Sequence, residues 1–174
     1  MPEFTCSSLR FSIKIASGES SSFEYDVFPA LLKEKVPFFG FVMSRQNWRD
    51  IGSPQSYLAA HLDILSGKVN MPVHRVFSTG SSNGSSNALV RKDCVIKKQA
   101  QIVNSVVSPG THIQDSAVTE NSVIWSKSLI SASAEISSSV IDHGCHIGRN
   151  VTLKNGVLGE RTYIADYSRL HFPA

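Results

Sequence analysis

From Arg91 to Ala174 an aliphatic residue returns every five or six positions, and a small residue almost always lies two places before it. This period is too short for helices and too regular for chance. It predicts a parallel β-helix, in which short strands wind round a prism and each coil covers the one before it. The aliphatic residues expected inside are Ile96, Ile102, Val107, Ile113, Val118, Ile124, Ile130, Ile136, Ile141, Ile147, Leu153, Leu158, Ile164 and Leu170.

The small residues are expected to share the interior. Side chains alternate along a strand, so an aliphatic residue and the residue two before it point to the same side. A small side chain leaves room for the backbone to bend at each corner. We interpret Cys94 and Cys145, which occupy two of these positions, as compact apolar fillers rather than metal ligands or nucleophiles. The others are Ala100, Ser105, Thr111, Ser116, Ser122, Ser128, Ala134, Ser139, Val151, Gly156, Thr162 and Ser168.

The spacing also predicts corners and coils. Five-residue steps end at Val107, Val118, Ile141 and Leu158, and the remaining steps have six residues. With three strands to a coil, the repeat predicts about four to five coils. Residues that tolerate positive φ stand three places after several aliphatic residues, as corners require. These are Gly110, Asn121, Gly144 and Asn150.

The segment before the repeat has a different composition. Residues 78–87 consist almost entirely of Ser, Gly and Asn. Such a run cannot bury enough apolar area to offset its ordering entropy. We therefore divide the chain into a first block at 1–67, a linker at 68–90 and the β-helix at 91–174.

The clearest helix of the first block follows Ser53. Serine suits the cap, Pro54 suits the first turn, and apolar residues then recur at helical spacing until Gly67 ends the helix. The other elements expected in this block are a helix over 26–34 and strands over 9–15 and 37–43.

Charge and hydropathy exclude some classes of function. The net charge is +3 without any dense block of Lys and Arg, which argues against binding of nucleic acid. No apolar run approaches the span of a bilayer, and the start of the chain does not have the pattern of a signal peptide. We expect a cytoplasmic protein.

Three segments of the first block resemble a known family. Residues 22–31, 48–54 and 57–61 are similar to the C-terminal third of sugar-1-phosphate nucleotidyltransferases, and most similar to the mannose-1-phosphate guanylyltransferase type. The following repeat resembles the hexapeptide β-helix appended to these enzymes. The resemblance implies part of a Rossmann-like α/β domain joined to a left-handed parallel β-helix. The left hand is implied by the resemblance alone, since parallel crossovers are normally right-handed.

The resemblance also implies a reaction and a site residue. Such enzymes form a nucleotide sugar, such as GDP-mannose, from a sugar 1-phosphate and a nucleoside triphosphate, and they release pyrophosphate with the help of Mg²⁺. Asp50 matches the metal-binding aspartate of the family's Trp-x-Asp-x-Gly-[Thr/Ser] segment. The alternative for Asp50 is a hydrogen bond to the turn before the helix. We interpret Glu24 and Asp26 as residues of a helix start, and Arg49 as a solvated neighbour.

The chain departs from the family in one respect. We find no Gly-rich phosphate loop, because Gly80 and Gly84 lie in the linker and neither follows a strand. The first metal-binding aspartate and the lysine that meets the sugar phosphate also have no counterpart. We therefore expect a fragment that is inactive alone and that exposes apolar surface in its first block.

Two other functions remain open. The first is a structural or regulatory subunit that assembles through the β-helix with a second copy or with a full-length nucleotidyltransferase, as in the related exchange-factor subunits of translation initiation. The second is a hexapeptide acyltransferase, whose histidine base would correspond to His143 or His146. The repeat places His143 at a corner and His146 on the outside, so we expect both to be surface residues.

Overall fold

The computed structural model describes residues 18, 20–37, 49–69 and 87–173. The chain divides into two compact units, 1–46 and 47–174, which we describe separately. The strands expected over 9–15 and over most of 37–43 lie outside the described residues. No helix in the described ranges is long and apolar enough to cross a membrane; cytoplasmic location stays a prediction.

The first unit contains a π-helical turn, η1 (Phe23–Val27), that continues into α2 (Phe28–Lys33). The Ser22 hydroxyl accepts a hydrogen bond from the Tyr25 N–H at 3.3 Å. The Asp26 carboxylate in turn accepts one from the Ser22 N–H at 2.7 Å. These bonds satisfy N–H groups at the helix start, so the predicted helix and the structural role of Asp26 are confirmed.

Apolar side chains of the first block are exposed, as the sequence predicts. At least half of the surface is exposed for each of four large apolar residues: Phe23, Tyr25 and Leu32 in the first unit and Ile51 in the second. Val27 and Leu31 are buried. Large exposed apolar groups of this kind indicate surface that another polypeptide can cover.

The second unit begins with α3 (Pro54–Leu65), the helix predicted after Ser53. The Ser53 hydroxyl accepts a hydrogen bond from the Ser56 N–H at 3.1 Å, and the Ser56 hydroxyl accepts one from the Ser53 N–H at 3.1 Å. This reciprocal pair is a capping box, and it explains why the helix begins here. Gly67, with φ of +77°, follows the end of the helix in the conformation that glycine tolerates best.

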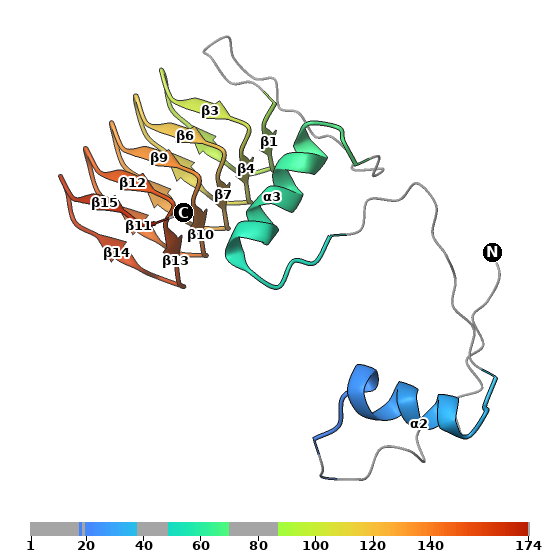
Figure 1. The fold of residues 1–174 in the computed structure, drawn as a ribbon. Coiled ribbons are helices and arrows are strands. Elements are labelled where there is room, and N and C mark those ends of the chain that lie inside the picture. Colours follow the sequence, from blue (N-terminus) through green and yellow to red (C-terminus); the bar gives the residue numbers. More distant parts are fainter. Residues whose placement is uncertain (1–17, 19, 38–48, 70–86, 174) are drawn as a thin grey trace. The chain divides into compact units, whose positions relative to one another are not determined.

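The rest of the second unit is a left-handed parallel β-helix of five coils, built from three five-stranded sheets (Figure 1). The first sheet contains β1 (Leu89–Val90), β4 (Val106–Val107), β7 (Val123–Ile124), β10 (Val140–Ile141) and β13 (Val157–Leu158). The second contains β2 (Val95–Ile96), β5 (His112–Ile113), β8 (Leu129–Ile130), β11 (His146–Ile147) and β14 (Tyr163–Ile164). The third contains β3 (Gln101–Val103), β6 (Val118–Glu120), β9 (Glu135–Ser137), β12 (Thr152–Lys154) and β15 (Arg169–His171).

Every coil has the same length. Neighbouring strands pair so that Ile96 stands beside Ile113, and Ile113 beside Ile130, which sets a translation of 17 residues per coil. The steps between successive interior residues are therefore six, six and five throughout. The prediction of a left-handed β-helix is confirmed, and the number of coils is at the upper end of the expected range.

One predicted register position is wrong. Val118 was expected inside with Ser116, but the buried residues are Thr119 and Ala117, both 0% exposed. Thr119 pairs with Ile102 and with Ile136, so the coil closes only when threonine takes the interior position. Because every coil needs 17 residues, the five-residue step ends at Ile124 rather than at Val118. Ser116 is instead an exposed corner residue with φ of +57°.

The other interior positions follow the prediction. The aliphatic residues from Ile102 to Leu158, apart from Val118, are buried. Ile96 in the first coil and Ile164 and Leu170 in the last are more exposed, because one side of each lacks a covering coil in the described residues. The four predicted corner residues all have positive φ: Gly110, Asn121, Gly144 and Asn150.

Small polar residues in the interior form a hydrogen-bonded column. The Ser105 hydroxyl accepts a bond from the Ser122 N–H, the Ser122 hydroxyl from the Ser139 N–H, and the Ser139 hydroxyl from the Gly156 N–H, at 3.0–3.1 Å. Each of the three hydroxyls also donates to the carbonyl two residues before it. Serine therefore fits this slot because it satisfies its own buried hydroxyl as well as a backbone donor of the next coil.

Candidate functional site

Asp50 lies just before α3 and is exposed. Its Oδ1 accepts a hydrogen bond from the Gly52 N–H at 3.0 Å, which is the turn-stabilising contact considered as the alternative to metal binding. Among the described residues there is no group of three or more His, Cys, Asp or Glu side chains that could hold a metal ion. The Asp50 carboxylate is a ligand type that suits Mg²⁺, but the described residues do not surround it with a complete set of ligands. Metal binding by Asp50 stays a prediction.

Arg49, the neighbour of Asp50, is not merely solvated. Its guanidinium forms an ion pair with Asp63 on α3, and Lys68 binds the same carboxylate at 3.1 Å. The hydrogen bond from Lys68 lowers the pKa of Asp63 most strongly, and the hydrogen bond from Arg49 lowers it further. These contacts join the segment that carries Asp50 to the helix that follows it.

His143 lies at a corner and bridges two coils, as its predicted surface position allows. Its Nδ1 is 3.0 Å from Asp142 Oδ1, and its Nε2 is 3.0 Å from Glu160 Oε1. The His143 N–H and ring together lower the pKa of Asp142. Because both ring nitrogens face carboxylates, this geometry indicates a link between coils rather than a general base with a free nitrogen.

His146 points outward from β11. Its ring meets that of Tyr163 edge-on, with centroids 5.0 Å apart, and its Nε2 lies 3.4 Å from the Ser131 hydroxyl. Neither histidine lines the groove described below. The described residues therefore give no geometric support to the acyltransferase alternative.

The two described cysteines act as interior fillers. The Cys145 thiol donates to the Gly159 carbonyl at 3.2 Å, and the Cys94 thiol donates to the Ser108 carbonyl at 3.1 Å. Burial raises the pKa of both thiols, which keeps them protonated. This agrees with their interpretation as compact side chains rather than nucleophiles.

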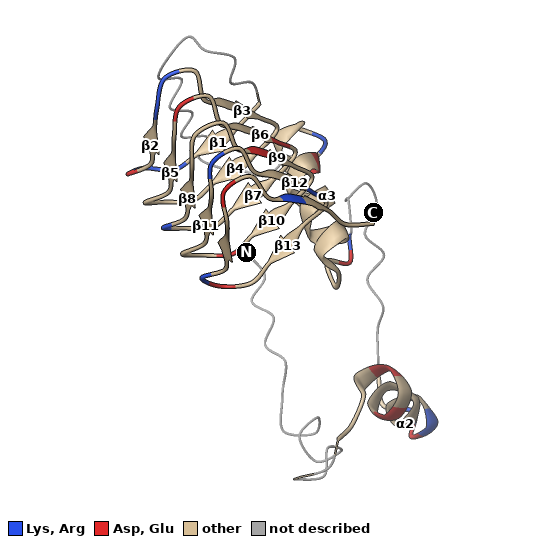
Figure 2. Cartoon of the chain, turned by 90° about the vertical axis from the view of Figure 1, so that its left-hand side faces the viewer, with Lys and Arg blue, Asp and Glu red and all other residues tan. Residues whose placement is uncertain are grey.

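α3 packs on the outer face of the first sheet. The strands of that sheet carry no charged residue, whereas charged residues occur elsewhere on the coils (Figure 2). Burial raises the pKa of Tyr57 on α3, and the side chain of Trp125, just after β7, lowers it in part. The outward position before each interior residue is aliphatic in all five coils of this sheet, so the helix has an apolar surface to cover. These residues are Leu89, Val106, Val123, Val140 and Val157.

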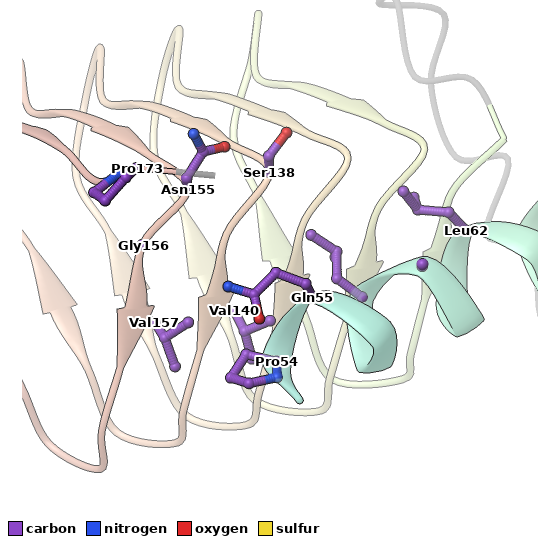
Figure 3. Close-up of a pocket in the computed structure, with 11 residues that line it drawn as sticks. Pro54, Gln55, Leu62, Ser138, Val140, Asn155, Gly156, Val157 and Pro173 are labelled. Carbon is purple, nitrogen blue, oxygen red and sulfur yellow. The ribbon is translucent and has the colours of Figure 1, made fainter. Parts of the chain in front are cut away.

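An open groove remains where α3 stops short of the last coils. It has a cavity volume of about 190 Å³. The helix contributes Pro54, Leu58 and Leu62 to its lining, and the coils contribute Val140, Val157 and Pro173 (Figure 3). The sequence reasoning missed this groove. The signal that could have located it is the outward aliphatic residue that recurs every 17 residues on one sheet only.

Comparisons with known protein families match the β-helix and the segment before it separately. Residues 84–171 match the family described as the GMPPB C-terminal domain, and residues 4–67 match the family described as nucleotidyl transferase. The fold and the matches together define a nucleotidyltransferase segment followed by a β-helical domain. The chain belongs to the sugar-1-phosphate nucleotidyltransferase family with a C-terminal β-helix.

Two curated relatives are glucose-1-phosphate adenylyltransferases. The protein of Clostridium botulinum (strain Eklund 17B / Type B) is 26% identical over 124 residues, which are 61% of this chain and 30% of the relative. The protein of Acetivibrio thermocellus is 25% identical over 134 residues, 67% of this chain and 30% of the relative. This chain thus spans about 30% of the length of both relatives.

Among solved structures, the CcmM N-terminal domain in complex with CcmN matches with a TM-score of 0.46 and 18% sequence identity. The match covers 52% of this chain and 96% of that chain.

Proposed function

We propose that the chain is the C-terminal part of an enzyme that makes a nucleotide sugar of the GDP-mannose type. In this reaction an oxygen of the sugar 1-phosphate attacks the α-phosphorus of the nucleoside triphosphate, and pyrophosphate leaves. The observation that carries the proposal is the order of the two family matches, 4–67 and then 84–171, on one chain. The resemblance of the first block to the mannose-1-phosphate guanylyltransferase type supports mannose and guanine over the glucose and adenine of the curated relatives.

Asp50 is the residue of this chain that we assign to the reaction. Its position before the capped start of α3, held by Gly52, keeps the carboxylate at the surface of the second unit. When bound, Mg²⁺ would neutralise charge on the phosphates, and Asp50 would supply one hard oxygen ligand to it. The remaining ligands would come from the part of a nucleotidyltransferase domain that precedes residues 4–67 in the family.

We further propose that the chain does not catalyse the reaction alone. The support is that the sequence contains no phosphate-binding loop and that the described residues hold no cluster of three or more His, Cys, Asp or Glu side chains around Asp50.

The test is a pyrophosphate-release assay on the purified chain, with and without a separately expressed N-terminal segment of a nucleotidyltransferase domain. Mannose 1-phosphate with GTP and glucose 1-phosphate with ATP are compared. We expect release only in the mixture and faster with the first pair. Asp50→Asn should abolish release, whereas Glu34→Gln, a change in the first unit, should preserve it. Release by the chain alone would contradict the inactivity, and failure of every complement would contradict the enzymatic proposal.

A structural or regulatory subunit is the second candidate. The observation that favours it is the apolar groove between α3 and the first sheet, lined by Leu58, Leu62 and Val140. An apolar groove favours assembly with another chain, either a second copy or a full-length nucleotidyltransferase. Sedimentation equilibrium of the chain, alone and with a full-length enzyme, tests this candidate. Capture of a translation initiation factor would instead support the exchange-factor branch.

A further inference from the structure

Asp63 occupies an unfavourable position for a carboxylate. It lies in the last turn of α3, and that turn contains no basic residue. The carbonyl groups at the end of a helix carry partial negative charge, so a carboxylate there is destabilising unless cations neutralise it. Two cations from outside the helix do so in the described structure. An acid placed against the local preference indicates a role beyond the helix itself.

Each oxygen of the Asp63 carboxylate binds one cation. Oδ2 binds the Arg49 guanidinium, and Oδ1 binds the Lys68 ammonium at 3.1 Å. The backbone brings Lys68 to this point, because its N–H donates to the Asp63 carbonyl at 3.0 Å. Arg49 precedes the first residue of α3, yet it contacts the last turn of the helix. The segment 49–53 therefore runs back beside α3, and the Asp63 carboxylate holds its first residue there.

The ion pair between Arg49 and Asp63 affects the carboxylate next to Arg49. A guanidinium on a flexible side chain can reach a carboxylate on the adjacent residue, here Asp50. In the structure the Arg49 guanidinium pairs with Asp63 instead. Asp50 Oδ1 accepts the Gly52 N–H at 3.0 Å, and Oδ2 has no partner in the part of the chain that the structure describes. Asp50 is exposed, so this oxygen is open to a cation from solution.

We propose that Asp63 is a positioning residue for Asp50. It holds the Arg49 guanidinium at the last turn of α3, so that Asp50 keeps its negative charge for a divalent cation. Without Asp63, the guanidinium would pair with Asp50 and compete with the cation for the same carboxylate. Lys68 supports the site by neutralising the other oxygen of Asp63 at the helix end. This inference rests on the proposed metal-binding role of Asp50.

A titration of the full chain with Mn²⁺, followed in ¹H–¹⁵N spectra, tests the inference without an activity assay. Mn²⁺ binds the same hard oxygen ligands as Mg²⁺, and it broadens the signals of nearby amides. The Gly52 amide reports on Asp50, and Asp50→Asn should remove its broadening. Asp63→Asn should raise the Mn²⁺ concentration for half-maximal broadening about threefold, which is the size expected from one exposed ion pair.

A second substitution separates this role from a structural one. Arg49→Gln combined with Asp63→Asn should restore the Mn²⁺ response of the parent chain, since no guanidinium is left to compete. A loss of helix stability in Asp63→Asn would not be reversed in this way. Asp63→Glu keeps the charge and should behave as the parent chain does. Asp166→Asn is the matched control, because it releases Arg149 between β11 and β12 and should not change the response of Gly52.

The outcomes distinguish this inference from the role of Asp50. Equal Mn²⁺ responses of the parent chain and Asp63→Asn would overturn the inference and leave metal binding by Asp50 intact. A raised Mn²⁺ requirement that Arg49→Gln does not reverse would also overturn it, because Asp63 would then act through the fold of the segment. If the Gly52 amide of the parent chain is not broadened, Asp50 binds no cation, and both proposals fail.

Discussion

Thr119 pairs with Ile102 in the third sheet and fills the same interior column with a hydroxyl-bearing side chain. Thr119 is 0% exposed, and its Oγ1 is the buried side-chain oxygen that lacks a hydrogen-bond partner in the described structure. A buried hydroxyl without a partner destabilises a fold, because its bond to water is lost and not replaced.

Thr119→Val should therefore stabilise the β-helix. The two side chains have nearly the same shape, so the change removes the desolvation cost without opening a cavity. We expect the free energy of unfolding to rise by about 1–2 kcal/mol, measured by urea denaturation. Thr152→Val, at an outward position of β12, is the control and should have little effect. A decrease in stability for Thr119→Val would mean that the hydroxyl has a partner.

Gly148→Ala should destabilise the last two coils. A Cβ at Gly148 would lie 2.5 Å from the backbone nitrogen of Asp166, so the fifth coil would have to move. We expect a loss of about 2 kcal/mol or more in the free energy of unfolding, as for overpacking in a rigid core. Gly159→Ala is the matched control, because nothing lies within 4 Å of a Cβ there. Equal melting temperatures for the two variants would contradict this close approach.

Ser138→Asn should complete a column of amides along one corner. The Asn87 amide donates to Asn104 at 3.0 Å, and the Asn104 amide donates to Asn121 at 3.2 Å. Ser138 is the next residue of the column and has φ of +48°, a conformation that asparagine tolerates better than serine. Asparagine should add one hydrogen bond and about 0.5–1.5 kcal/mol of stability, measured by thermal unfolding.

Lys127→Asn is the control for this change. Lys127 has φ of +58°, and its neighbours one coil away on either side, Gly110 and Gly144, carry no side-chain amide. It therefore reports the gain from backbone conformation without a neighbouring amide. If the two variants gain equally, the amide column contributes nothing.

Stability should fall at acid pH partly through Asp166. The Arg149 N–H donates to Asp166 Oδ1 at 2.7 Å, and the Arg149 guanidinium contacts Oδ2 at 3.0 Å. Both bonds lower the pKa of Asp166 below its ordinary value of 3.8, and the bond from the backbone N–H has the larger effect. A carboxyl whose pKa is lower in the folded state contributes stability above its ordinary pKa, and the contribution is lost as the pH falls through the lowered value.

Asp166→Asn should accordingly reduce the pH dependence of unfolding below about pH 4. Urea denaturation of the parent and the variant, measured from pH 7 down to pH 2.5, checks this. The two chains should converge in stability as the pH falls. Parallel curves over the whole range would show that the Arg149 contacts do not favour the ionised carboxyl.

Much of the fold could be predicted from residue spacing. The inward residues Ile113, Ile130 and Ile147 and the corners at Gly110 and Asn150 follow from a period that places each side chain inside, outside or at a bend. The start of α3 at Ser53 and Pro54 follows from capping chemistry within four residues. Such features depend on local backbone geometry, so a sequence read in order contains them.

The position of Thr119 could not be predicted in the same way. Valine is more apolar than threonine, so a rule based on hydrophobicity prefers Val118 as the interior residue. The interior residue is decided by the 17-residue coil, which places Thr119 beside Ile102 of the coil before and Ile136 of the coil after. This condition involves three coils at once. The bridge from His143 to Glu160 has the same origin, because it joins residues 17 apart at one corner.

The sequence by itself determined the period, the inward and outward alternation and the family of this protein, since each depends on short-range spacing or on matching segments. Only the tertiary structure decided which outward aliphatic residues α3 covers, and that a groove remains between the helix and Val140 and Val157. The physical reason is that burial of an outward side chain depends on a second element brought against it through space. No local spacing encodes how far that element reaches.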